Sequence, residues 1–312
     1  MKKLIWFLLL CPMLVYGQGP QVPSRMTFAG IDLRIQSGAQ AEIQRDVDAL
    51  THSPKYFKIK ADRAAQYFPI IERIFREEGL PEDFKYLVLQ ESALISDAVS
   101  SSNAVGFWQF KEASGGEMGL RMDRQVDERM NIVSASRAAA KYLQKNNYYF
   151  NNWVIALQAY QMGAGAAMNA VGEKYNGVKK MTIDKSTYWY VKKFLAHYVA
   201  FQGVQTNSGY LQEFTQGGDM SLQQIARDYD VDHEILSEYN TWLKKGKIPM
   251  DKEYTGIIPG EGVVVAPVVA ATKLDSDKDF DDGIAVKFPE IDGVDMPDQP
   301  FILKVNGILG IV

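Results

Sequence analysis

Residues 84–95, FKYLVLQESALI, carry a single acid on an apolar helical face. Phe84, Leu87, Val88 and Glu91 stand at positions i, i+3, i+4 and i+7, so a helix places them on one stripe. No lysine or arginine lies one turn away to pair with the carboxylate. Burial disfavours the charged form of a carboxyl group and raises its pKa, so Glu91 can act as a general acid near neutral pH. The alternative is an acid at the helix rim that faces solvent.

A polar loop suited to sugar binding follows at residues 100–110, SSSNAVGFWQF. Its candidate binding residues are Ser100, Gly106, Trp108 and Gln109. Aromatic faces stack on sugar rings, while hydroxyls and amides form hydrogen bonds with sugar hydroxyls and N-acetyl groups. Tyr160 and Gln161 interrupt the apolar stripe of their own helix in the same way. An aromatic core beside an ordinary polar loop is the alternative interpretation.

The elements that must position these residues are predicted to be helices. Apolar spacing predicts a helix from Asp62, which Pro69 either kinks or divides. Gly79 can end this helix, and Pro81 can start the next one. Further helices are expected near residues 133–147, 151–171 and 187–202. Because residues 60–205 show no alternating strand pattern, this part of the chain is predicted to be all-α.

The chain begins with two lysines and an apolar run, a pattern typical of a secretory signal peptide at residues 1–17. Cleavage is expected after Gly17, and an uncleaved membrane anchor is the alternative. The only cysteine, Cys11, lies inside this segment, so the mature chain is expected to have no disulfide. Residues 18–59 give weak signals and are predicted to form an N-terminal extension.

The pattern changes after Gly203. The stretches SLQQIARDY and DHEILSEYN predict two short helices, the second capped by Asp232. YTGIIP and GVVVAPVVA resemble short strands, so residues 214–268 are predicted to form a small second domain. Residues 269–312 are predicted to form an acidic tail. Its run DSDKDFDDG does not fit a calcium loop, because Phe280 and Val286 replace the required Gly and Glu.

Composition narrows the function classes. The 312 residues, 46% hydrophobic and 23% charged, fit a globular protein of one or two domains. Removal of Lys2 and Lys3 with the signal peptide leaves 32 basic against 38 acidic residues, a formal charge of −6. This balance argues against a nucleic-acid partner. Three scattered histidines argue against a histidine-rich metal site, and no cofactor is expected.

Six segments occur in an order that resembles a known family. They are LPEDFKYLVLQESAL, AVSSSNAVGFWQF, SGGEMGL, VDER, FNNWVIALQAYQMGAG and STYWYVKKFLA. Together they resemble the catalytic domain of the lytic transglycosylases, closest to the membrane-bound lytic murein transglycosylase D group. The resemblance implies a mainly α fold with a lysozyme-like all-α catalytic domain at residues 60–205. It also implies a peptidoglycan lytic exo/endo-transglycosylase, a carbon–oxygen lyase that cleaves the MurNAc–GlcNAc β-1,4 bond in the periplasm or envelope of a Gram-negative bacterium.

The resemblance assigns roles residue by residue. Glu91 matches the only catalytic acid of the family. The residues that match substrate-binding positions are Ser100, Gly106, Trp108, Gln109, Tyr160, Gln161 and Tyr190. Thr187 precedes Tyr190 in a T-x-x-Y-V element, and Asp127 with Arg129 matches a D-x-R element expected to form a structural ion pair. Gln161 departs from the asparagine of the family's A-Y-N-x-G element, and its added methylene displaces the amide.

The expected mechanism follows from the single acid. Ordinary glycosidases use two carboxylates about 5 Å or more apart. Asp97, Glu112, Asp127 and Glu128 are interpreted as solvated surface acids rather than as a second catalytic group. The hypothesis is substrate assistance by the MurNAc acetamide and closure of a 1,6-anhydro ring. A goose-type lysozyme-like hydrolase and a non-catalytic peptidoglycan-binding scaffold remain alternatives.

The downstream stretch resembles a LysM module, a small α+β (βααβ) unit that binds GlcNAc-containing chains. The match is imperfect, because Met220 and Ser221 add a residue and the stretch from Thr241 to Glu253 is long. The expected partners are therefore peptidoglycan glycan strands, with peripheral association with the membrane or envelope.

Overall fold

The computed structural model describes residues 19–260, 302–305 and 308–311. The predicted signal peptide, the GVVVAPVVA stretch and the DSDKDFDDG run lie outside the described residues. The α-helices are α1 (Ser37–Thr51), α2 (Pro54–Glu78), α3 (Leu87–Ser92), α4 (Glu112–Glu117), α5 (Ile132–Phe150), α6 (Trp153–Met162), α7 (Ala164–Val171), α8 (Trp189–Phe201), α9 (Leu222–Asp228) and α10 (His233–Tyr239). Two 3₁₀ turns, η1 (Glu82–Tyr86) and η2 (Glu128–Met130), precede α3 and α5.

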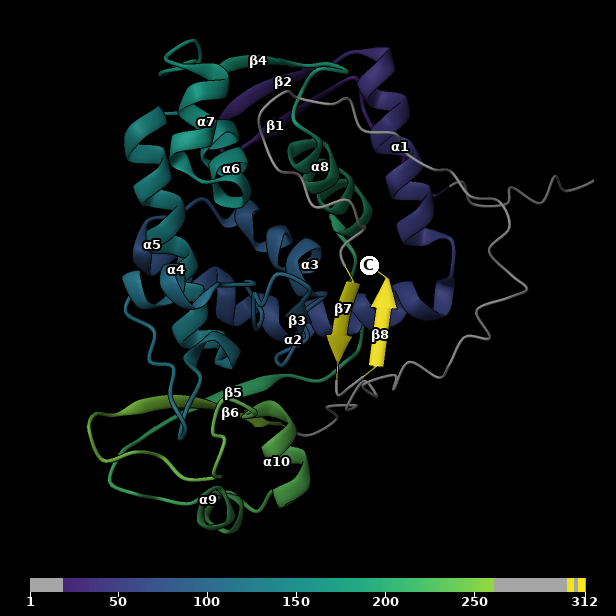
Figure 1. Ribbon diagram of the computed structural model, residues 1–312. Helices are drawn as coiled ribbons and strands as arrows, with labels where there is room; N and C mark the ends of the chain where they lie inside the picture. The colour runs from purple at the N-terminus through teal and green to yellow at the C-terminus, as the bar shows by residue number, and fades with distance from the viewer. Residues whose placement is uncertain (1–18, 261–301, 306–307, 312) are drawn as a thin grey trace, which may run out of the picture.

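The strands are short and form separate small sheets (Figure 1). They are β1 (Arg25–Phe28), β2 (Ile31–Ile35), β3 (Val99–Ser100), β4 (Lys180–Ile183), β5 (Leu211–Gln216), β6 (Tyr254–Pro259), β7 (Ile302–Val305) and β8 (Ile308–Ile311). The sheet orders are β1-β2-β4, β3-β7-β8 and β5-β6.

Local sequence signals explain where the main helices begin and end. Gly79 ends α2 in the left-handed region at φ 70°, as predicted, while Pro69 lies inside α2 without dividing it. Asn131 caps α5, because its side-chain oxygen accepts from the backbone N–H of Val133 and Ser134. The single helix predicted at 151–171 is instead α6 and α7, separated by Gly163 at φ 84°.

Residues 60–205 are not all-α, which corrects the sequence prediction. β4 pairs in parallel with β2, with Asp32 opposite Lys180 and Ile35 opposite Ile183. β1 completes this sheet by antiparallel pairing with β2. The four residues KMTI of β4 alternate between exposed and buried, but the stretch is too short to show a strand period without its distant partner.

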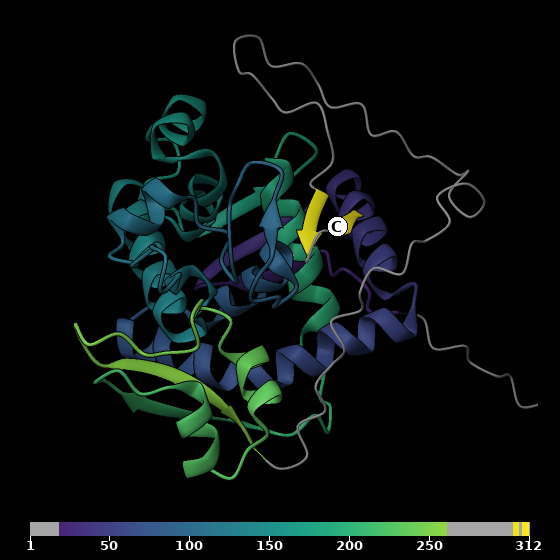
Figure 2. The same ribbon diagram turned by 60° about the horizontal axis from the view of Figure 1, so that its bottom comes forward.

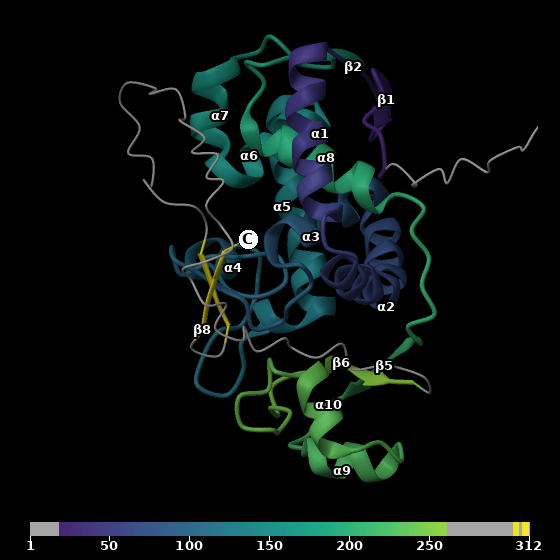
Figure 3. The same cartoon turned by 90° about the vertical axis from the view of Figure 1, so that its right-hand side faces the viewer.

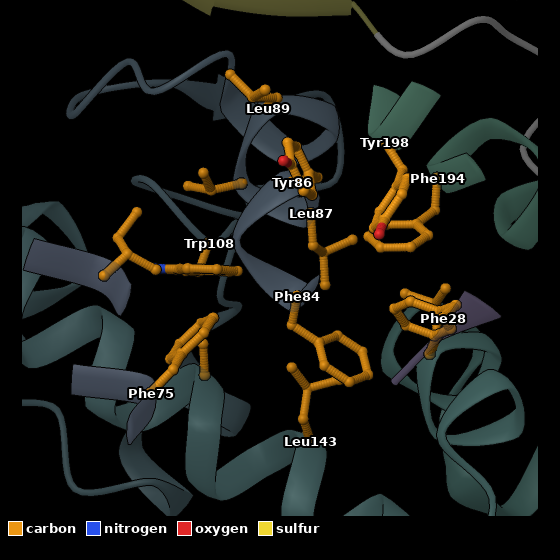
Figure 4. Packing of buried hydrophobic residues seen from close by; sticks show 14 of the residues in the cluster. Phe28, Phe75, Phe84, Tyr86, Leu87, Leu89, Trp108, Leu143, Phe194 and Tyr198 are labelled. Atoms are coloured by element: carbon orange, nitrogen blue, oxygen red, sulfur yellow. The ribbon is translucent and has the colours of Figure 1, made fainter. Parts of the chain in front are cut away.

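The residues before α2, predicted as an extension, contribute to the main hydrophobic core. Ile31 and Ile43 are fully buried in the same cluster as the helices from 60 to 201. The ring of Phe28 lies 5.1 Å from that of Phe84 and 4.9 Å from that of Phe194 (Figure 4). Such aromatic packing stabilises a core beyond the area that it buries, so the N-terminal sheet helps to fix η1, which leads into α3, and α8.

Residues 211–259 form a compact βααβ unit, here called the C-terminal module. β5 and β6 pair antiparallel from Leu211 opposite Pro259 to Gln216 opposite Tyr254, and α9 and α10 lie between them in the chain. Asp232 caps α10 as predicted, accepting from two backbone N–H groups. The order of elements agrees with the sequence expectation, and the identity as a LysM module remains a prediction.

The C-terminal module lies alongside α2, at the opposite end of the molecule from the β1-β2-β4 sheet (Figures 1, 2 and 3). Segment 121–131 of the helical part joins the two. Val126 is fully buried in the hydrophobic core of the module, and the backbone N–H of Asp127 donates to the carbonyl of Trp242 at 2.9 Å. Arg73 of α2 also forms an ion pair with Glu213 of β5.

Within the predicted tail 269–312, the described residues form a hairpin. β7 and β8 pair antiparallel, and β7 also pairs with β3, with Leu303 opposite Ser100 (Figure 1). Among the described residues, no helix is both long and apolar enough to cross a membrane.

Candidate active site

Glu91 lies near the C-terminal end of the short helix α3. The helix ends because Ala93 and Leu94 adopt left-handed backbone conformations at φ 50° and 61°. Ser92 is fully buried, and its hydroxyl donates to the carbonyl of Phe107 at 2.8 Å. This bond ties the end of α3 to the loop 98–110, so the acid and the loop form one unit.

The carboxyl group of Glu91 is partly exposed and contacts α8. The hydroxyl of Tyr190, a buried residue, donates to Oε1 of Glu91. Burial raises the pKa of Glu91 to about 7, while the Tyr190 hydrogen bond and the charge of Lys193 lower it in part. The prediction of a desolvated acid is consistent with this geometry, and the partner is a tyrosine rather than a cation.

Tyr160 of α6 lies close enough to Glu91 for the charge of Glu91 to affect the pKa of Tyr160. Its hydroxyl donates to the carbonyl of Trp108 at 2.8 Å, and its ring lies 5.4 Å from that of Tyr142. Burial and the neighbouring charge of Glu91 hold the pKa of Tyr160 well above its usual value. Tyr160 therefore remains a neutral hydrogen-bonding group that joins α6 to the loop.

The expectation that Trp108 stacks on a sugar is wrong for its side chain. The indole is fully buried, its ring lies 5.5 Å from that of Phe75, and its Nε1–H donates to Ser136 Oγ at 3.0 Å (Figure 4). A fully buried ring cannot offer a face to a ligand. Trp108 instead anchors the loop in the core and presents its carbonyl to Tyr160.

The close approach predicted at Gly106 is to the protein itself. Gly106 has φ 84°, and a Cβ there would lie 2.0 Å from the carbonyl oxygen of Arg129. Gln109 is also left-handed at φ 50°, and its amide nitrogen donates to the carbonyls of Ala98 (3.1 Å) and Gly106 (2.9 Å). Both residues shape the loop, and the Gln109 amide nitrogen is occupied within it.

Ser100 also serves the internal structure of the loop. It is buried, its Oγ accepts from the backbone N–H of Ala104 at 3.0 Å, and it lies 3.1 Å from Ser102 Oγ. Its hydroxyl therefore fixes the turn after β3.

Gln161 is exposed next to Tyr160 and has a partner that sequence reasoning missed. The hydroxyl of Tyr188 donates to its side-chain oxygen Oε1. Tyr188 immediately precedes α8, two residues before Tyr190. In the aromatic run TYWY, only Thr187 and Tyr190 match the T-x-x-Y-V element, which gives no signal for Tyr188. The Oγ1 of Thr187 accepts from the N–H of Asp184.

Two of the carboxylates considered as second catalytic groups are buried, which corrects their interpretation as solvated acids. Asp127 forms the predicted ion pair with Arg129 at 2.7 Å. Glu128 accepts from Ser134 Oγ at 2.9 Å and pairs with Lys252 of the C-terminal module at 3.1 Å. Both therefore have structural partners at the junction with the module. Glu112 is exposed, as expected.

Among residues 19–260, no group of three or more histidine, cysteine or acidic side chains is arranged to hold a metal ion.

The segment that contains Glu91 and most of the surrounding site residues matches a known protein family. Residues 68–183 match the transglycosylase SLT domain. This range includes Glu91, the loop 98–110 and Tyr160, whereas Tyr190 lies just beyond it.

Two curated relatives have the same description. The chain is 28% identical over 177 residues to membrane-bound lytic murein transglycosylase D of Escherichia coli strain K12, and equally to that of Escherichia coli O6:H1. The alignment covers 54% of this chain and 39% of the length of each relative. Among solved structures, an inactive mutant of the lytic transglycosylase Slt from Pseudomonas aeruginosa has a TM-score of 0.34 and 22% identity, over 43% of this chain and 23% of the other.

Proposed function

We propose that this protein is a peptidoglycan lytic transglycosylase that cleaves the MurNAc–GlcNAc β-1,4 bond and leaves 1,6-anhydro-MurNAc ends. The match of residues 68–183 to the SLT domain and the relation to murein transglycosylases support the reaction class. One observation carries the assignment of Glu91 as the general acid and base. Its carboxyl group is partly exposed, accepts a hydrogen bond from Tyr190 and has a pKa of about 7. A group with this pKa can both donate and accept a proton near neutral pH.

The first step is protonation of the leaving group. Tyr190 donates to Oε1 of Glu91, so the proton of the neutral carboxyl group is carried by the other oxygen, Oε2. Transfer of that proton to the glycosidic oxygen accompanies cleavage of its bond to C1 of MurNAc. The acetamide oxygen of the same sugar stabilises the positive charge that develops at C1.

The second step restores the acid. The Glu91 carboxylate removes the proton of the MurNAc C6 hydroxyl, and the C6 oxygen forms a bond to C1. The 1,6-anhydro ring closes without water, and Glu91 ends the cycle protonated. Tyr190 and the charge of Lys193 stabilise the transient carboxylate, since both lower the pKa of Glu91.

The partners of Asp127 and Glu128 argue against ordinary two-carboxylate hydrolysis with either of them as the second group. Asp127 is paired with Arg129, and Glu128 is paired with Lys252, so neither is free to activate water. A hydrolase would need such a base at a separation of roughly 6.5 Å or more for inversion, or a nucleophile at about 5 Å for retention.

The test is Glu91→Gln in the chain from residue 18 to 312, assayed by release of soluble fragments from purified peptidoglycan sacculi. General acid–base catalysis typically contributes 10²–10⁴-fold, so we expect a loss of at least about a hundredfold. Co-sedimentation with sacculi should be unchanged, because glutamine keeps the shape of the side chain. Substantial activity in the variant would remove Glu91 from the proposed role.

The same experiment distinguishes the proposed enzyme from a non-catalytic peptidoglycan-binding protein. Gln161, at the position where the family has asparagine, is the feature that favours a non-catalytic peptidoglycan-binding protein. Such a protein would sediment with sacculi and release no fragments, with or without Glu91.

We further propose a location in the periplasm or cell envelope, where this substrate lies, and glycan binding by the C-terminal module. The βααβ order of the module supports the second proposal. Co-sedimentation of the full chain with sacculi, in competition with GlcNAc oligosaccharides, tests glycan binding.

A further inference from the structure

Gln161 is exposed at the C-terminal end of α6, yet its side chain is not free. Its Oε1 accepts the hydrogen bond of the Tyr188 hydroxyl, which comes from a segment 27 residues away in the chain. The main chain turns sharply two residues later, at Gly163 with φ 84°. The amide therefore lies between the end of α6 and the start of α8.

Tyr188 is itself held by the aromatic residues that lead to the acid. Its ring lies 5.8 Å from that of Trp189, which lies 5.6 Å from that of Tyr190 and perpendicular to it. The hydroxyl of Tyr190 in turn contacts Glu91. A continuous series of contacts thus joins the Gln161 amide to the carboxyl group.

The hydrogen bond decides which end of the amide remains available. A glutamine amide offers one oxygen acceptor and one NH₂ donor. Because Tyr188 donates to the oxygen, the oxygen is engaged and the NH₂ group is left to donate to a ligand. A free glutamine on the surface would sample several rotamers and present either end.

We propose that Tyr188 is a positioning residue that holds the Gln161 amide so that its NH₂ group donates to a carbonyl oxygen of the substrate, that of a sugar N-acetyl group. This inference rests on the proposed function, because it takes the ligand to be an N-acetylated glycan. Gln161 has one methylene more than the asparagine of the family element, and its oxygen accepts from the Tyr188 hydroxyl.

The test is a double-mutant cycle with Tyr188→Phe, Gln161→Asn and the double variant, measured as kcat/KM on soluble glycan fragments. Each single change should lower kcat/KM on the order of three- to tenfold, the effect of one neutral hydrogen bond. Asparagine is one methylene shorter and is expected to lose the bond, so Tyr188→Phe should have little further effect in the Gln161→Asn background. Losses that multiply in the double variant would overturn the inference, as would an unchanged Tyr188→Phe enzyme.

One further variant and one further measurement complete the test. Gln161→Met removes the amide at an exposed position with little risk to folding, and it should match the loss in Tyr188→Phe. Tyr188→Phe should also leave the pH dependence set by Glu91 unchanged, which separates positioning of the amide from an effect on the acid. A shifted pH dependence would contradict the proposed role.

Binding of Glu91→Gln and Glu91→Gln/Tyr188→Phe to sacculi distinguishes failure of this inference from failure of the proposed function. Weaker binding of the second variant supports the inference even if the wild-type protein releases no fragments. Equal binding of the two variants, together with equal kcat/KM of wild type and Tyr188→Phe, refutes it while leaving the proposed activity intact.

Discussion

At the scale of single residues, the site depends on opposing effects on one carboxyl group. Burial raises the pKa of Glu91, whereas the Tyr190 hydrogen bond and the charge of Lys193 lower it, and the result is about 7. Without the two opposing groups, Glu91 would hold its proton too strongly to act as a base in the proposed second step.

Tyr190→Phe should move the alkaline limb of the pH–rate profile to higher pH. Phenylalanine fills the same buried volume but cannot donate to Oε1, so the carboxylate loses a stabilising bond and the pKa of Glu91 rises further. The profile of kcat/KM between pH 5 and 9, in about half-unit steps, checks this. A limb that stays in place or moves to lower pH would show that the bond does not control the acid.

Glu91→Gln should increase stability, and more so at high pH. The folded-state pKa of about 7 exceeds the ordinary value of 4.5, so the native state holds this proton more tightly than the unfolded state. Wild type therefore loses stability as the pH rises from 4.5 through 7, by up to about 3 kcal/mol, and glutamine escapes this loss. Urea unfolding of both proteins at pH 5 and pH 8.5 measures the difference. A gap of the same size at both pH values would argue against a desolvated carboxyl group.

The sequence located the acid but not its surroundings. The apolar stripe of residues 84–95 identified Glu91 as unpartnered, because helix periodicity is a local property. The partner Tyr190 came only from the resemblance, and Tyr188 was missed, because contacts between α6, α3 and α8 depend on packing. Nothing in the loop sequence shows whether the indole of Trp108 points inward or outward, and the structure places it inside.

At the scale of elements, the loop 98–110 is held from both sides. Ser92 ties it to α3, and Gly106 packs directly on the carbonyl of Arg129 in segment 121–131. This close approach leaves no space for a side chain. The loop thereby keeps a fixed position relative to Glu91.

Gly106→Ala should destabilise the protein by roughly 2–4 kcal/mol, because it adds a backbone strain at φ 84° and a collision with the Arg129 carbonyl. Gly119→Ala is the matched control, since Gly119 has φ 88° and open space around it. It should cost only the strain, roughly 1–2 kcal/mol. If urea unfolding showed equal losses of unfolding free energy in the two variants, the loop would have to shift at Gly106 to accommodate the added methyl group.

Helices were predictable where their periodicity and caps were strong, as for α2, α5 and α8. The sheet β1-β2-β4 was not, because β2 and β4 are short and far apart in the chain, and their pairing is a tertiary contact. The break at Gly163 was also missed. An isolated glycine in an alanine-rich stretch is compatible with a continuous helix, and its positive φ appears only in the structure.

At the scale of the whole molecule, the C-terminal module packs against the helical part and is not structurally separate from it. Val126, from the helical part, is fully buried in the core of the module, and Asn131 Nδ2 donates to the carbonyl of Thr255 in β6 at 2.8 Å. The same segment supports Gly106 through Arg129. The module therefore helps to hold the loop beside Glu91.

Residues 19–260 should accordingly unfold in a single calorimetric transition. Val126→Ala should lower the temperature of that whole transition, because it removes both γ-methyl groups from a buried site, a loss that typically costs about 2 kcal/mol or more. Val204→Ala, at an exposed position outside both cores, should leave it unchanged. Two separate transitions, of which Val126→Ala moved only one, would mean that the module and the helical part are energetically independent.

The most direct measurement of the central proposal is mass spectrometry of the soluble products that residues 18–312 release from purified sacculi. Cleavage by a single acid with ring closure predicts anhydro-muropeptides, each lighter by one water than the corresponding hydrolytic product. These products should disappear with Glu91→Gln. Muropeptides with ordinary reducing ends would show instead that water attacks C1, and would contradict the mechanism.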